Sequence, residues 1–117
     1  MKEQVLDSIL RNKVVAILRN VDDDKIYPTA EALYAGGIRL LEVTFNQSDP
    51  DPIGGTVSQI RRLCKEFEGR MYIGAGTVMT AEQVQAAKGA GASFIISPNV
   101  SRAVIEKTVA LDMVSMP

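Results

Sequence analysis

The sequence predicts a parallel α/β fold in which functional side chains gather at one edge of a sheet. Four short apolar runs recur along the chain, and each ends in a polar or turn-forming residue. Parallel strands covered by helices on both faces have nearly continuous apolar sequences, and in barrels of such strands the chemistry lies at the carboxyl ends. The four runs are residues 15–19, 40–44, 72–77 and 94–98.

Helical periodicity precedes and follows the first run. Apolar residues recur at helical spacing in residues 2–11, which predicts a short amphipathic helix that plugs or flanks the sheet. After the first run, the acidic cluster 22–24 supplies an N-cap and favourable charge for a second helix. The pair Gly36 and Gly37 ends that helix, since glycine adopts the left-handed conformation common at helix C-termini.

The rest of the chain repeats this pattern of helix, glycine and strand. Residues 46–55 are rich in turn formers and predict a loop, and a third helix follows. Thr80 with Gln83 fits a capping box for a fourth helix, and Ser101 begins a fifth. Residues 113–117 predict a fifth strand. The sequence thus predicts about five of the eight strands of a (β/α)₈ TIM barrel, and we expect the remaining three to lie beyond this chain.

Composition narrows the chemistry. A chain of 117 residues forms one domain, and its net charge of −1 gives no basis for binding nucleic acid. Histidine is absent and cysteine occurs once, which excludes Ser-His and Cys-His nucleophiles, a His/Cys zinc site and an internal disulfide. Acid/base chemistry must therefore use carboxylates or lysine. We expect no metal and no cofactor.

The expected cellular location follows from the lengths of the apolar runs. No run approaches the ~20 apolar residues that a membrane helix needs, and the first seven residues lack the apolar core of a signal peptide. We therefore expect a cytoplasmic protein without a membrane partner.

Glu42 is the sharpest candidate site residue because it interrupts an apolar strand. An ionised carboxylate is costly to bury unless it is paired or functional. Arg19 ends the preceding strand and Thr77 ends the following one, so the three are expected to share one edge. The alternative for Glu42 and Arg19 is a cross-strand ion pair with no further role, and the sequence leaves both interpretations open.

Three other features have mainly structural interpretations. The stretch 74–79 begins like a dinucleotide fingerprint, but Met79 occupies the position of its third glycine. Gly74 and Gly76 instead indicate close approach of backbone to a ligand or a neighbouring strand. The acids 22–24 are expected to cap a helix rather than bind magnesium, and Cys64 is expected in the core.

The ordered set of these segments resembles a known family. Residues 16–19, 35–37, 41–44, 73–78 and 96–98 are similar to the 2-keto-3-deoxy-6-phosphogluconate aldolases and 4-hydroxy-2-oxoglutarate aldolases. The resemblance implies a class I, Schiff-base aldolase on a (β/α)₈ barrel, a homotrimer when complete. Such a lyase cleaves 2-keto-4-hydroxy acids of Entner-Doudoroff carbohydrate metabolism to pyruvate and an aldehyde, without metal.

The resemblance also assigns roles. Glu42 matches the general acid/base, Arg19 and Thr77 match positions that hold the substrate carboxylate, and Pro98 matches a residue lining the pocket. Asn46 stands where many relatives carry arginine or threonine. The family's Schiff-base lysine lies on the sixth strand in a Lys-x-Phe-Pro motif, which this sequence lacks. None of the six lysines is expected at the carboxyl end of a strand.

These observations lead to one hypothesis and two alternatives. Residues 1–117 are expected to be the N-terminal portion of a single (β/α)₈ aldolase domain that acts on a keto acid, either pyruvate or a phosphorylated keto-deoxy sugar acid. One alternative is a truncated, non-catalytic α/β fragment that self-associates. The other is a carboxylate-binding module that uses Arg19 and Thr77 without chemistry.

Overall fold

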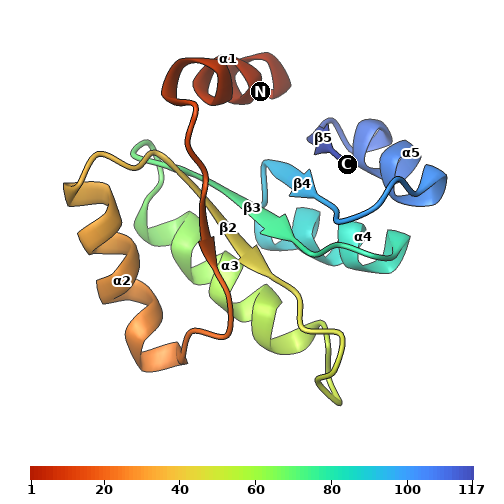
Figure 1. Ribbon diagram of the computed structural model, residues 1–117, viewed down its shortest axis with the longest axis horizontal. Coiled ribbons are helices and arrows are strands. Elements are labelled where there is room, and N and C mark those ends of the chain that lie inside the picture. The colour runs from red at the N-terminus through yellow and green to blue at the C-terminus, as the bar shows by residue number, and fades with distance from the viewer.

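The computed structural model describes residues 1–117, in which five helices alternate with five strands (Figure 1). All strand pairs are parallel and the strand order is β1-β2-β3-β4-β5. This is a (β/α)₈-type arrangement with five strands, as the sequence predicts. The elements are α1 (Lys2–Asn12), β1 (Ala16–Leu18), α2 (Asp23–Ala35), β2 (Leu40–Thr44), α3 (Gly54–Glu66), β3 (Tyr72–Gly76), α4 (Ala81–Ala90), β4 (Phe94–Ile96), α5 (Arg102–Ala110) and β5 (Val114–Met116).

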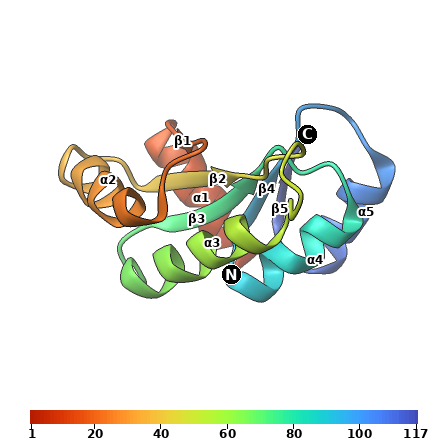
Figure 2. The same ribbon diagram turned by 90° about the horizontal axis from the view of Figure 1, so that it is seen from below.

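The sheet has two different faces because successive strand side chains point to opposite sides. On the outer face, Leu41, Val43 and Ile73 join residues of α2, α3, α4 and α5 in a hydrophobic core of 20 buried residues. On the inner face, Leu40 and Phe94 belong to a separate cluster of only four buried residues. Figure 2 shows the curvature of the sheet with α3 and α4 along its outer side.

Helix α1 lies at the end of the sheet where the strands begin (Figure 1). Its Val5 is fully buried and packs with Leu40, Phe94 and Val114 on the inner face. The amphipathic pattern therefore predicts both the helix and its flanking position. The helix extends one residue further than expected, to Asn12, and Lys13 follows in the left-handed conformation with φ of 66°.

The predicted helix caps are only partly present. Thr80 and Ser101 accept hydrogen bonds from the backbone N–H groups of Gln83, at 3.1 Å, and Val104, at 3.4 Å. Asp22 occupies the N-cap position of α2, but its side chain makes no capping hydrogen bond and instead lies 3.9 Å from Lys25 Nζ. A nearby cation thus attracts the carboxylate that the sequence assigns to the cap.

The outer core includes Cys64 only at its margin. The side chain is half-buried and packs against the outer-face cluster, close to Gly91. Burial raises the pKa of the Cys64 thiol to about 11, so the thiol is the dominant form at neutral pH. The expected packing role is therefore confirmed, with less burial than the sequence suggests.

No helix combines the length and the apolarity that crossing a membrane requires.

Candidate functional site

The carboxyl ends of β1 and β3 bring two of the predicted site residues together. Arg19 immediately follows β1, and Thr77 immediately follows β3. The Arg19 Nη2 group donates a hydrogen bond to Thr77 Oγ1 over 3.5 Å. At that length the bond is weak, so both groups retain capacity to bind an anion between them.

Glu42 lies one layer deeper than the sequence suggests. It is the middle residue of β2, its Cα pairs with Ile17 of β1 and Gly74 of β3, and the residue is only 5% exposed. The side chain belongs to the inner face, since it alternates with Leu41 and Val43 of the outer core. Glu42 is therefore buried, as its place in an apolar strand indicates, but it lies below the Arg19–Thr77 pair rather than level with it at the edge.

The two glycines of β3 make room for inner-face side chains. A methyl group at Gly76 would overlap the Glu42 carboxylate, and one at Gly74 would overlap the ring of Phe94. Gly74 and Gly76 therefore allow close approach to the backbone, as the sequence indicates. The groups that approach are the Glu42 carboxylate and the Phe94 ring.

Burial and a nearby cation act in opposite directions on Glu42. Desolvation raises the pKa of the Glu42 carboxyl, and the positive charge of Arg19 partly offsets that rise. The two side chains do not form an ion pair within 4 Å, so the cross-strand ion-pair alternative is wrong. Arg19 reaches Thr77 instead. A carboxyl group with a raised pKa, close to a cation, suits general acid/base catalysis.

Two glutamines near Thr77 were not predicted as site residues. Gln47 Nε2 donates to the Thr77 carbonyl over 2.9 Å, and Gln83 Nε2 donates to Gln47 Oε1 over 3.0 Å. Gln83 is only 2% exposed. The capping pattern marks Gln83 in the sequence, but its side chain accepts from Met79 N rather than from the cap residue. The sequence carries no comparable signal for Gln47.

Pro98 and Asn46 occupy the same edge of the sheet. Pro98 is exposed and lies two residues after the end of β4, while Asn46 is exposed in the loop after β2. Asn46 lines a polar cavity of about 260 Å³ between the loops that follow β1 and β2. The other residues of this cavity carry amide, hydroxyl or carboxylate groups apart from Val21 and Gly55; they are Asn20, Asp22, Asp23, Thr44, Asp49, Thr56 and Gln59.

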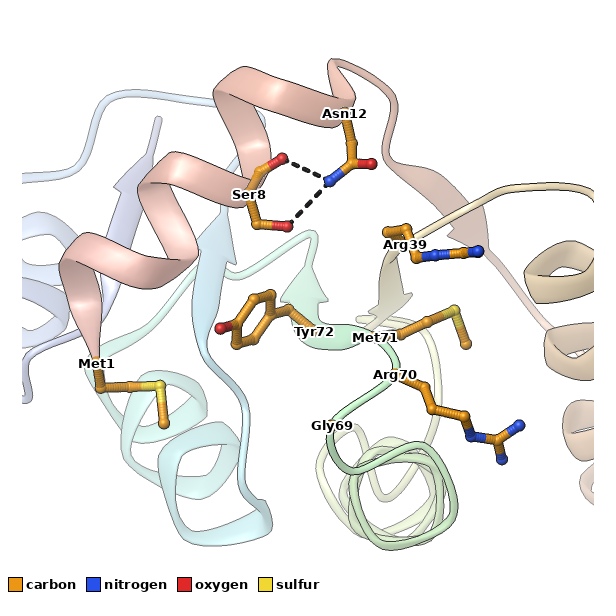
Figure 3. A pocket seen from close by; sticks show the side chains of 8 residues that line it. All are labelled: Met1, Ser8, Asn12, Arg39, Gly69, Arg70, Met71 and Tyr72. Atoms are coloured by element: carbon orange, nitrogen blue, oxygen red, sulfur yellow. Dashed lines mark hydrogen bonds between the residues drawn. The ribbon is translucent and has the colours of Figure 1, made fainter.

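A larger cavity of about 370 Å³ lies at the opposite end of the sheet, between α1 and the beginnings of β2 and β3 (Figure 3). The guanidinium groups of Arg39 and Arg70 point away from Ser8, Asn12 and Tyr72. Arg39 Nη1 donates to two backbone carbonyl oxygens, at 2.8 and 3.0 Å. Active sites of parallel barrels lie at the carboxyl ends of the strands, so this cavity at the opposite end is not the site candidate.

None of the six lysines follows a strand. Lys2, Lys25, Lys65, Lys88 and Lys107 lie within helices, and Lys13 caps α1. No group of three or more Cys, Asp or Glu side chains is placed to hold a metal ion.

Almost the whole sequence matches a single protein family. Residues 5–117 match the family described as KDPG and KHG aldolase. The chain belongs to this aldolase family. It is 34% identical over 101 residues to a 2-dehydro-3-deoxy-phosphogluconate aldolase of Treponema pallidum. The aligned residues cover 86% of this chain and 45% of the relative.

Solved structures of KDPG aldolases have the same fold. The enzyme of Zymomonas mobilis, solved with 3-phosphoglycerate, is 34% identical with a TM-score of 0.77 over 96% of this chain and 50% of its own. The enzyme of Legionella pneumophila, captured with pyruvate as a covalent carbinolamine, is 32% identical with a TM-score of 0.74 over 88% and 47%. The chain therefore spans about half the length of the aldolases it matches.

Proposed function

We propose that residues 1–117 form the N-terminal portion of a single (β/α)₈ aldolase domain. In this proposal they supply the acid/base and carboxylate-binding side of a class I aldolase. The substrates are 2-keto-4-hydroxy acids such as 2-keto-3-deoxy-6-phosphogluconate or 4-hydroxy-2-oxoglutarate, cleaved to pyruvate and an aldehyde. The supporting observation is the buried Glu42, with its raised pKa, directly beneath the Arg19–Thr77 pair.

Arg19 and Thr77 bind the carboxylate of the keto acid. A guanidinium and a hydroxyl donate charge-assisted hydrogen bonds to an anion, and these are stronger than bonds between neutral groups. Their weak mutual bond leaves donors free for that purpose. Pro98 and Asn46 lie at the same edge, where they border the rest of the substrate.

Glu42 moves protons during bond cleavage. A lysine amine adds to the C2 carbonyl and loses water to give an iminium ion. A carboxylate then removes the C4 hydroxyl proton, the C3–C4 bond breaks, and its electron pair forms the enamine while the aldehyde leaves. The enamine regains a proton at C3, and water releases pyruvate. Because burial raises the pKa of Glu42, its carboxylate is a stronger base than an exposed one, which suits it to accept and return the proton.

The lysine of this scheme belongs to the part of the barrel outside residues 1–117. All six lysines of the chain lie in helices or at a helix end, and none lies at the carboxyl end of a strand. The covalent carbinolamine in the Legionella pneumophila relative supports an amine-based route. We also propose that the complete enzyme is a homotrimer, as the family resemblance implies.

A substitution at Glu42 tests the acid/base role. In the complete enzyme, Glu42→Gln should lower turnover by about 10²–10⁴-fold, which is the usual contribution of a positioned proton-transfer group. Pyruvate affinity should change little because Arg19 and Thr77 remain. Glu82→Gln, at an exposed position of α4, is the matched control and should retain full turnover. Unchanged turnover in the Glu42 variant would contradict the proposal.

The carboxylate-binding module is a second candidate, favoured by the absence of lysine from the strand ends. Titration of the chain with pyruvate separates this module from a non-catalytic fragment. The module should bind pyruvate and lose that binding in Arg19→Met, whereas the fragment should not bind pyruvate at all. Arg102→Met, at an exposed arginine of α5, is the matched control. Binding of pyruvate by the chain, with no turnover by the complete protein, would favour the module over the enzyme.

A further inference from the structure

We infer that Gln83 is a positioning residue for the carboxylate site, acting through Gln47 to fix the backbone and hydroxyl of Thr77. This inference rests on the proposed function, in which Thr77 and Arg19 hold the substrate carboxylate. Gln83 does not touch Arg19 or Thr77 itself. Its effect passes along a continuous series of hydrogen bonds between the loops that follow β2 and β3.

The hydrogen bonds join both ends of the turn 77–79. Gln83 Oε1 accepts from the Met79 N–H over 2.8 Å, and Gln83 Nε2 donates to Gln47 Oε1 over 3.0 Å. Gln47 Nε2 in turn donates to the Thr77 carbonyl over 2.9 Å. One buried amide therefore fixes the turn directly at Met79 and indirectly at Thr77.

This turn needs support because Thr77 has an unfavourable backbone conformation. Its φ is 53°, in the left-handed region that a β-branched residue rarely adopts. Such strain costs on the order of 1–3 kcal/mol and persists only where surrounding bonds enforce it. The adjacent Val78 N–H donates to the Ile96 carbonyl over 3.2 Å, and the Gly76 carbonyl accepts from Phe45 N over 2.9 Å. The hydrogen bonds of Gln47 to Thr77 and of Gln83 to Met79 add to these backbone bonds.

The amide side chain of Gln83 meets two hydrogen-bonding requirements at once. The group must accept from a backbone N–H and donate to another amide at the same time, whereas a carboxylate donates nothing and a hydrocarbon does neither. Gln83 is 2% exposed, so water cannot readily replace a lost partner. The hydrogen bonds of Gln83 and its burial both indicate that this side chain stabilises the turn 77–79.

Fixing Thr77 benefits carboxylate binding by preorganisation. The left-handed conformation places Thr77 Oγ1 within 3.5 Å of Arg19 Nη2, so both donors face one location before the anion arrives. A site that is ordered in advance loses less entropy on binding. Without the glutamine bonds, Thr77 is free to relax to an ordinary conformation that turns its hydroxyl away from Arg19.

Three variants of the chain test this inference. Gln83→Leu removes both bonds of the buried amide. Gln47→Ala, at an exposed position, removes the bond to the Thr77 carbonyl and the bond from Gln83 Nε2, but it keeps the bond between the Met79 N–H and Gln83. It therefore reports on Thr77 even if the leucine variant folds poorly. Gln85→Leu makes the same change as the first variant at an exposed position of the same helix and is the matched control.

Three measurements are compared among these variants. Hydrogen exchange at the Met79 amide reports the bond to Gln83, NMR couplings of Thr77 report its φ, and NMR titration gives the dissociation constant for pyruvate. Gln83→Leu should accelerate exchange at Met79, and both Gln83→Leu and Gln47→Ala should change the Thr77 couplings. Each should weaken pyruvate binding by about tenfold, equivalent to one net hydrogen bond. Gln85→Leu should match the unmodified chain in all three.

The remaining outcomes separate two kinds of failure. Unchanged Thr77 couplings in both Gln83→Leu and Gln47→Ala would overturn the inference, and so would altered couplings with unchanged pyruvate affinity. If the unmodified chain binds no pyruvate, the carboxylate site itself fails. In that case altered couplings in the variants would show that the glutamines fix Thr77 for structural reasons alone.

Discussion

The two faces of the sheet are built on different principles although they share the same strands. The outer face is a continuous apolar core of 20 buried residues beneath four helices. The inner face has a small apolar cluster at the α1 end, then Glu42, and then the Arg19–Thr77 pair at the carboxyl end. Along β1, β2 and β3 the inner face therefore becomes more polar towards the carboxyl end, whereas the outer face of these strands is apolar.

This difference separates stability from chemistry. Outer-face residues need only to be apolar and of suitable size, because core packing tolerates many arrangements. Inner-face residues depend on particular pairs, such as Glu42 with Gly76 and Phe94 with Gly74. We therefore expect outer-face substitutions to change the free energy of unfolding most, and inner-face substitutions to change the site.

The largest expected effect is on the outer face. Phe67 is fully buried and packs against Tyr27 and Tyr34, with ring centroids 5.6 and 6.3 Å apart. Phe67→Ala should lower the free energy of unfolding by about 3–5 kcal/mol. Ile17→Ala, on the inner face and 57% exposed, should change it by no more than about 0.5 kcal/mol. Urea unfolding measures both, and similar losses would remove the distinction between the faces.

The next effect comes from adding one methyl group to the inner face. Gly76→Ala should lower the free energy of unfolding by about 1–3 kcal/mol, since the methyl group overlaps the Glu42 carboxylate. It should also shift the titration of Glu42 observed by NMR, because the carboxylate must move. Gly89→Ala, in α4 with open space around it, is the control and should stabilise the chain by about 0.5–1 kcal/mol. An unshifted Glu42 in Gly76→Ala would refute this account of Gly76.

The smallest effect concerns pH. Burial raises the pKa of Glu42 above its ordinary value of 4.5, so the folded chain binds this proton more tightly than the unfolded chain. The contribution of Glu42 to stability is therefore fully present below pH 4.5 and is lost as the pH rises through the folded-state pKa. Glu42→Gln should remove that part of the decline, so the variant should gain stability relative to the parent as the pH rises above 4.5. A parallel pH dependence in both proteins would mean that Glu42 is not desolvated.

The order of elements could be predicted from the sequence because each element has a local cause. Apolar periodicity marks α1, and Gly36 and Gly37 mark the end of α2, where Gly37 adopts a φ of 103°. The shared edge of Arg19 and Thr77 follows from parallel strands alone. These predictions needed no knowledge of side-chain contacts.

The finer geometry of the site could not be predicted because it depends on tertiary contacts. The depth of Glu42 follows from the register of β2 against β3, which no local pattern specifies. The left-handed Thr77 opposes the preference of its own residue type, so local rules predict the wrong conformation. Asp22 likewise has the residue type of a cap but interacts with Lys25 instead.

Gly76 has a consequence for how tolerance to substitution is interpreted. It carries no functional group, yet every other amino acid at this position would displace the carboxylate of Glu42. A saturation-mutagenesis screen scored by activity should therefore rank Gly76 beside Glu42, although one residue has chemistry and the other has only space. In this protein, the positions that such a screen marks as essential include both the reacting group and the volume that the group occupies.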